Sequence, residues 1–213
     1  MKKRIFQSIL VLFVLFNSYL SFEFTFIDGN TILYYNLFRL ITNVFLLIFF
    51  VFLFMKESGR YIFSLASVCA TASFGLSFYN AIKDSFDVES LINIFSMASL
   101  VIGLVLTIVY AFKNFNNKIL GLLSSVSLTI GGVLFVIYDV ISAYNYNESF
   151  THDPICNPEG IFNYASFIGD VVFNFLLEFG IVVPILIYCI YRSKKTANKW
   201  INTKGGWIFQ PPF

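Results

Sequence analysis

The sequence predicts an all-α fold: a polytopic membrane protein built as a bundle of six transmembrane helices. Its composition is the first reason, because 58% of the 213 residues are hydrophobic and only 12% are charged, whereas soluble domains carry about 25% charged residues. The second is that six apolar runs each approach or exceed the roughly 20 residues that a helix needs to cross a bilayer. Third, these runs do not alternate apolar and polar residues, as the strands of a membrane barrel would.

The expected spans, in chain order, are 5–22, 34–55, 61–82, 91–112, 119–141 and 163–191. The first run has a basic start and also resembles a secretory signal peptide. Cleavage normally needs small residues at the cleavage site, where the chain has Tyr19 and Leu20 instead. We therefore expect a retained helix; cleavage would leave five spans with the same orientations.

Small residues indicate which helices pack closely, because lipid tails are as apolar as leucine and membrane helices associate mainly through close contact and hydrogen bonds. The third run carries such residues on one face and the fifth carries several along its length: Ala66, Ala70, Ser73 and Ser77, then Gly121, Ser125, Gly131 and Gly132. We expect these two helices in the middle of the bundle and the bulkier first and second helices at its edge. We expect no internal repeat, because residues 5–82 do not align with 91–191 as the halves of a transporter-like inverted repeat would.

Basic residues set the expected orientation, since cytoplasmic connections of membrane proteins are rich in lysine and arginine. Twelve of them flank one set of span ends: Lys2, Lys3, Arg4, Lys56, Arg60, Lys113, Lys118, Arg192, Lys194, Lys195, Lys199 and Lys204. The opposite connections hold Lys83 as their one basic residue, together with eight carboxylates. We therefore expect both termini in the cytoplasm of a cell (plasma) membrane protein. The basic face would contact anionic lipid, and the net charge of +2 gives no reason to expect nucleic acid.

Four charged residues fall inside the expected spans: Arg39, Asp139, Asp170 and Glu178. A charge inside the hydrocarbon costs at least about 2.5–3.5 kcal/mol on insertion scales, so such residues are rare without a reason. Arg39, Asp139 and Asp170 lie toward the expected outer surface, and Glu178 lies near mid-membrane. We expect Glu178 to be the most readily protonated, because loss of water disfavours the charged form.

Polar residues follow one face of the sixth run, at intervals of four: Ser166, Asp170, Asn174 and Glu178. The second run has a shorter counterpart in Asn36, Arg39 and Asn43. Residues at this spacing share a helix face. We therefore predict a polar cavity open to the outside and lined by Arg39, Asn43, Asp170, Asn174 and Glu178. Arg39 would pair there with Asp170 or Asp139. Alternatively, Arg39 and Asp170 only hold the helices together, and Asp139 merely reaches the outer headgroups, which is the interpretation we favour for Asp139.

The connection 142–162 and the C-terminal segment complete the chain. Polar residues from Tyr144 onward predict a solvated loop, and His152 with Cys156 is too sparse a pattern to predict a metal site. We expect one transmembrane domain over 1–191 and a basic, aromatic cytoplasmic tail over 192–213. The tail would lie along the inner membrane surface, or alternatively dock a protein partner.

Three functions fit these features. The first is a transporter or permease-like subunit with a polar outward-facing cavity. The second is a non-catalytic membrane partner, such as an assembly, immunity or sensing subunit, with a protein partner or a homo-oligomer. The third is an intramembrane enzyme using Asp170 and Glu178, which lie about 12 Å apart along one helix. That is too far for one step, so the enzyme ranks last. No sequence motif predicts a cofactor or a bound metal.

Overall fold

The structure is a computed structural model, and it describes residues 2–26, 34–54, 59–83, 87–151 and 162–205. All regular secondary structure in these ranges is α-helical. The helices are α1 (Lys2–Phe26), α2 (Tyr34–Phe54), α3 (Arg60–Lys83), α4 (Val88–Phe112), α5 (Lys118–Thr151) and α6 (Tyr164–Gly205). The prediction of an all-α fold is confirmed.

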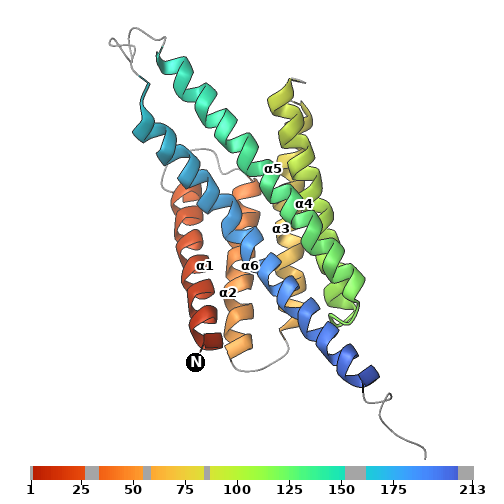
Figure 1. Cartoon of the computed structure of the whole chain (residues 1–213). Helices are drawn as coiled ribbons and strands as arrows, with labels where there is room; N and C mark the ends of the chain where they lie inside the picture. Colours follow the sequence, from red (N-terminus) through yellow and green to blue (C-terminus); the bar gives the residue numbers. More distant parts are fainter. Residues whose placement is uncertain (1, 27–33, 55–58, 84–86, 152–161, 206–213) are drawn as a thin grey trace, which may run out of the picture.

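The helices run alternately up and down the bundle (Figure 1). Each helix packs against its neighbour along the chain, and α6 also packs against α1, which closes a ring. Across this ring, α2 and α6 make a further, smaller contact. The expectation that the third and fifth helices occupy the middle is therefore wrong. Their small residues serve contacts with adjacent helices instead: Ala66, Ala70 and Ser73 of α3 are all buried.

Capping residues explain where several helices begin. The Asp87 carboxylate accepts a hydrogen bond from the Ser90 amide at 2.7 Å, and the Asn117 side chain accepts one from the Ile119 amide at 3.0 Å. Asn163 does the same for Ser166 at 3.1 Å. Such side chains satisfy amides that the first helical turn leaves without partners.

Three helices, α3, α4 and α5, are long and apolar enough to cross a membrane. The segments Tyr164–Leu177 and Phe179–Ser193 of α6, which meet at 47°, make a fourth if they count as one span. The other two helices contribute shorter apolar segments over their described residues, Ser8–Glu23 and Leu37–Phe52. The chain thus has the helices of an integral membrane protein, and six spans stay a prediction.

Two helices extend beyond the predicted spans. α5 continues to Thr151, through the stretch from Tyr144 that the sequence predicted as loop. α6 continues from the predicted sixth span into the predicted tail, as far as Gly205. His152 and Cys156 lie outside the described residues.

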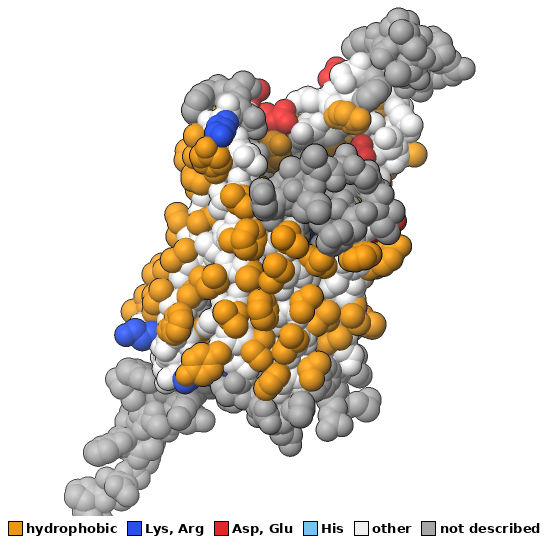
Figure 2. All heavy atoms as spheres, turned by 180° about the vertical axis from the view of Figure 1, so that it is seen from behind, with side chains coloured by type: hydrophobic (Ala, Val, Ile, Leu, Met, Phe, Trp, Pro, Cys, Tyr) orange, Lys and Arg blue, Asp and Glu red, His pale blue; other side chains and the backbone are white. Residues whose placement is uncertain are grey.

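The charged side chains gather at the two ends of the bundle, with a wide apolar surface between them (Figure 2). We call the end with the α4 N-terminus the acidic end, since the described residues there include Asp87, Glu89 and Glu148. The opposite end, with Arg60 and Arg192, is the basic end. This separation agrees with the pattern that the sequence predicted on the two sides of a membrane.

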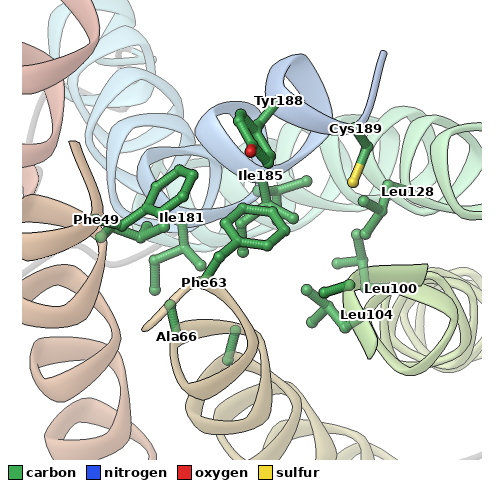
Figure 3. Packing of buried hydrophobic residues seen from close by; sticks show 14 of the residues in the cluster. Phe49, Phe63, Ala66, Leu100, Leu104, Leu128, Ile181, Ile185, Tyr188 and Cys189 are labelled. Atoms are coloured by element: carbon green, nitrogen blue, oxygen red, sulfur yellow. The ribbon is translucent and has the colours of Figure 1, made fainter. Parts of the chain in front are cut away.

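Aromatic side chains fill the core toward the basic end (Figure 3). Tyr188 of α6 lies 4.7 Å from both Phe49 and Phe63, measured between ring centroids, and 5.3 Å from Phe115. All four rings are buried. Phe115 lies in the turn between α4 and α5 with a positive φ of 57°, a conformation that costs a bulky residue free energy. The strained turn places its ring inside the cluster.

α4 and α5 carry a short internal repeat that the sequence analysis missed. Positions 96–106 and 124–134 align without gaps and are identical at seven positions: Ser96/Ser124, Ser99/Ser127, Leu100/Leu128, Ile102/Ile130, Gly103/Gly131, Val105/Val133 and Leu106/Leu134. Because the two helices run in opposite directions, the repeat is inverted in space (Figure 1).

The hydrogen bonds of the repeat are reciprocal. The Ser96 hydroxyl of α4 donates to the Gly131 carbonyl of α5 at 2.9 Å. The Ser124 hydroxyl of α5 donates to the Gly103 carbonyl of α4 at 3.1 Å. Equivalent residues thus make equivalent contacts, which means that a local two-fold axis relates the two helices.

The close packing is reciprocal as well. A Cβ atom at Gly103 would lie 2.8 Å from Leu128 Cγ, and one at Gly131 would lie 2.8 Å from Leu100 Cγ. In both cases the backbone nitrogen of the leucine would be 2.9 Å away. Only glycine permits backbones to approach this closely, so the α4–α5 pair is tightly interlocked.

Candidate functional site: buried polar contacts of α1, α2, α5 and α6

Two carboxylates of α5 and α6 accept hydrogen bonds from amides across the helix interface. Asn174 of α6 donates to the Asp139 carboxylate of α5 at 2.8 Å. Asn147 of α5 donates to the Asp170 carboxylate of α6 at 3.1 Å and also to the Ala143 carbonyl at 2.9 Å. Asp139 and Asn147 are both 5% exposed. The α5–α6 interface therefore holds two acid–amide pairs, which are about two helical turns apart along α5 and about one turn apart along α6.

The spacing of these residues explains why the pairs form. Asp170 and Asn174 are four residues apart on α6, and Asp139 and Asn147 are eight apart on α5. Both spacings keep side chains on one helix face. Because the helices run in opposite directions, Asp170 near the start of α6 lies beside Asn147 near the end of α5. Asn174, further along α6, lies beside Asp139, which comes earlier on α5.

α2 places Arg39 and Asn43 one turn apart on its buried face. Arg39 is 4% exposed and Asn43 is fully buried. Thr42 beside them is also fully buried, and its hydroxyl returns to the Phe38 carbonyl at 2.7 Å. An arginine buried to this extent in a predicted membrane helix is a functional-site candidate on physical grounds.

A third set of polar contacts joins α1, α2 and α6. The Asn17 side-chain amide of α1 donates to the carbonyls of Leu176 and Leu177 at 2.6 and 3.1 Å. Asn43 of α2 in turn donates to the Asn17 side-chain oxygen at 2.6 Å. Asn17 reaches α6 because Gly180 has no side chain; a Cβ atom there would overlap the Asn17 amide.

Four of the five predicted cavity residues have described side chains. Asp170 and Asn174 both lie at the α5–α6 contact, and Arg39 and Asn43 share the buried face of α2. The side chain of Glu178 lies outside the described residues. The described contact of the Asp170 carboxylate is with Asn147 and not with Arg39, whereas pairing of Arg39 with Asp139 stays a prediction.

Sequence reasoning missed Asn147 and Asn17. Asn147 was assigned to the solvated loop, although its spacing of eight from Asp139 places it on the same helix face. Asn17 lies within the long apolar stretch of the first run, and this isolation was the signal that could have identified it.

The chemistry available here is that of hydrogen-bond donors and acceptors inside an apolar bundle. Side-chain amides offer both a donor and an acceptor, and the carboxylates offer acceptors. Among the described residues, no group of three or more histidine, cysteine or acidic side chains could hold a metal ion.

Fold and contacts together define an all-helical integral membrane protein with polar contacts buried between its helices. No family model, no curated protein and no solved structure matches this chain.

Proposed function

We propose that this chain is a small transport protein or permease-like subunit in which a polar solute or ion enters from the acidic end, along the polar face of α6. The observation that supports this proposal most directly is the burial of Asp139. This residue is only 5% exposed, and its carboxylate accepts a hydrogen bond from Asn174. Burying a carboxylate in a membrane bundle costs several kcal/mol, and a purely apolar contact would join the helices without this cost. Proton binding and release at such a group gives a means to couple solute movement to the proton gradient.

Orientation supports the same proposal. The basic end corresponds to the cytoplasmic side by the distribution of lysine and arginine, so the acidic end would face outward. Asp170 and Asn147 then form the outer acid–amide pair, and Asp139 and Asn174 form the deeper one. Arg39 supplies the positive charge that offsets part of this negative charge. Both termini would lie in the cytoplasm of a plasma membrane protein.

Proton flux tests the proposal. The purified full-length protein is reconstituted into lipid vesicles that contain a pH-sensitive dye, and a pH gradient is imposed. We expect the wild type to dissipate the gradient faster than protein-free vesicles, and Asp139→Asn to slow it at least tenfold. The exposed Asn80→Ala variant should match the wild type. Wild-type flux no faster than that of empty vesicles would overturn the proposal.

One observation favours the alternative of a non-catalytic membrane partner. Asp139 and Asp170 both accept from amides of this same chain, as groups that only hold helices together would. This alternative predicts that Asp170→Ala, which removes the acceptor of the Asn147 amide, accumulates poorly in the membrane. Transport predicts normal accumulation with reduced flux, so the amount of folded variant distinguishes the two functions.

A further inference from the structure

In the contacts among α1, α2 and α6, Asn43 donates to Asn17, and Asn17 donates to α6. This order of donors and acceptors determines how each side-chain amide is oriented. The carbonyls of Leu176 and Leu177 can only accept, so the Asn17 atom that contacts them is the NH₂ group. The Asn17 oxygen therefore faces Asn43, which must present its own NH₂ group. This leaves the Asn43 side-chain oxygen pointing away from Asn17.

Among the residues that the structure describes, that oxygen of Asn43 has no hydrogen-bond partner, although the residue is fully buried. A buried acceptor without a donor costs about 1–3 kcal/mol, so native proteins rarely retain one. The missing group must be a hydrogen-bond donor, because the Asn43 oxygen can only accept. A molecule that brings a donor to this position would complete a relay from Asn43 through Asn17 to α6.

The position of Arg39 limits which class of molecule could bring a donor to the Asn43 oxygen. Its guanidinium lies one turn away on the same buried face of α2. A permanent positive charge at this distance disfavours a simple cation as the donor. With five N–H donors, a guanidinium can bind a carboxylate while retaining another partner. A ligand that fits both residues carries an anionic oxygen and, a few ångströms away, an N–H or O–H group.

The adjoining part of α6 is bent, and transport proteins often have irregular helices near mid-membrane at the substrate site. The segments before and after residue 178 meet at 47°, and the carbonyls that Asn17 contacts belong to this bend. Gly180 keeps α1 in direct contact with it. A ligand bound at Asn43 would therefore be linked, through Asn17, to the bend of α6.

We propose that the buried face of α2 at Arg39 and Asn43 binds a small amino or hydroxy acid. Arg39 holds the carboxylate, and the amino or hydroxyl group donates to the Asn43 oxygen. This inference deepens the proposed function, on which it rests, by naming the chemical class of the solute.

Ligand-dependent thermal unfolding tests the inference on the purified full-length protein. The probes are L-serine and L-lactate, with propionate lacking the donor and ethanolamine lacking the carboxylate. We expect the unfolding midpoint to rise saturably with at least one of the first two, and at least tenfold more weakly with either comparator. A stabilising ligand raises the midpoint because it binds the folded state.

Variants locate the site. Asn43→Ala should weaken the apparent affinity at least tenfold, and Asn93→Ala should retain it, although Asn93 also has a buried oxygen without a partner. If Asn43→Ala does not fold, Asn43→Ser and Arg39→Lys make the same prediction. An unchanged wild-type midpoint with all probes, as expected for an internal water alone, overturns the inference. So does an effect that persists in every folded Asn43 and Arg39 variant.

The ligand-binding experiment and the proton-flux experiment can fail independently, so they distinguish the two proposals. Saturable binding at Asn43 without proton flux would contradict transport and leave the ligand site standing. Flux that depends on Asp139, with no ligand effect at Asn43, would leave transport standing and remove this solute class.

Discussion

Gly180 determines how closely α1 approaches α6 at the bend. Its missing side chain leaves the space that the Asn17 amide occupies, and this amide contacts two α6 carbonyls. At the residue scale, the α1–α6 contact thus depends on a pair, a small residue on one helix and a polar residue on the other. Neither would suffice alone.

The pair can be tested with a double-mutant cycle. Gly180→Ala should lower the free energy of unfolding by about 1–3 kcal/mol, the usual cost of overpacking. Asn17→Ala should cost about 0.6 kcal/mol and at most about 1.7, the range for hydrogen bonds between membrane helices. With the amide gone, the added methyl group has room, so the double variant should be no less stable than Gly180→Ala. Additive losses would contradict the contact.

The Asp139–Asn174 contact gives a second prediction at this scale. Asn174→Ala removes a donor from a carboxylate that is 5% exposed. We expect a loss of about 1–3 kcal/mol, because a buried charged group loses a hydrogen bond. Chemical unfolding in detergent micelles measures it, with Asn80→Ala on the exposed surface of α3 as the control. Equal stability of both variants would show that Asn174 does not support Asp139.

At the element scale, the α4–α5 pair is the most symmetric part of the molecule. The same eleven-residue pattern occurs in both helices, and Ser96 and Ser124 make equivalent bonds to opposite glycines. The two helices should resist sliding past each other, because Leu100 and Leu128 each pack against a glycine of the other helix.

The symmetry predicts matched effects of matched changes. Gly103→Ala and Gly131→Ala should destabilise the protein by similar amounts, up to about 2 kcal/mol each, because an overpacking cost of about 1–3 kcal/mol is offset by a helix-propensity gain of about 1 kcal/mol. A Cβ atom at Gly75 of α3 meets nothing within 4 Å. Gly75→Ala is therefore the control and should leave stability unchanged or slightly raised. Strongly unequal losses at Gly103 and Gly131, measured by thermal unfolding, would contradict the two-fold relation.

The helices themselves were largely predictable from hydropathy. The runs 61–82 and 91–112 correspond closely to α3 and α4, because long apolar stretches leave the backbone no alternative to a helix in lipid. The extension of α5 to Thr151 was not predictable, since its last turns are polar and depend on contacts such as Asn145 with Glu89 at 2.8 Å. Hydropathy predicts which segments avoid water, but it does not predict contacts with a neighbouring helix such as the one between Asn145 and Glu89.

The polar site was predictable in part. Periodicity identified the face of α6 with Asp170 and Asn174, because spacing alone determines which residues share a helix face. It could not identify their partners, since Asn147 and Asn17 become partners only through the order in which the helices close the ring. Pairing across helices is a property of tertiary structure.

At the scale of the whole molecule, charge separates along the bundle axis. The described acids gather at one end, and most described bases gather at the other (Figure 2); Lys83 and Arg39 lie toward the acidic end. This distribution is expected for a protein that spans a membrane with its basic end in the cytoplasm. We predict that a reporter placed before Lys2 and one placed after Phe213 are both protected from protease in intact cells, whereas one inserted after Thr151 is cleaved. Cleavage of either terminal reporter would reverse or break this topology.

The central claim is that the polar face of α6 is reachable by water from the outside. Its most direct test is thiol labelling in intact cells, with Cys69, Cys156 and Cys189 replaced and one new cysteine introduced. Asn174→Cys should react with a membrane-impermeant maleimide added outside, whereas Val172→Cys, which is 50% exposed and expected to face lipid, should not. An Asn174→Cys variant that folds, inserts and stays unlabelled would contradict the account.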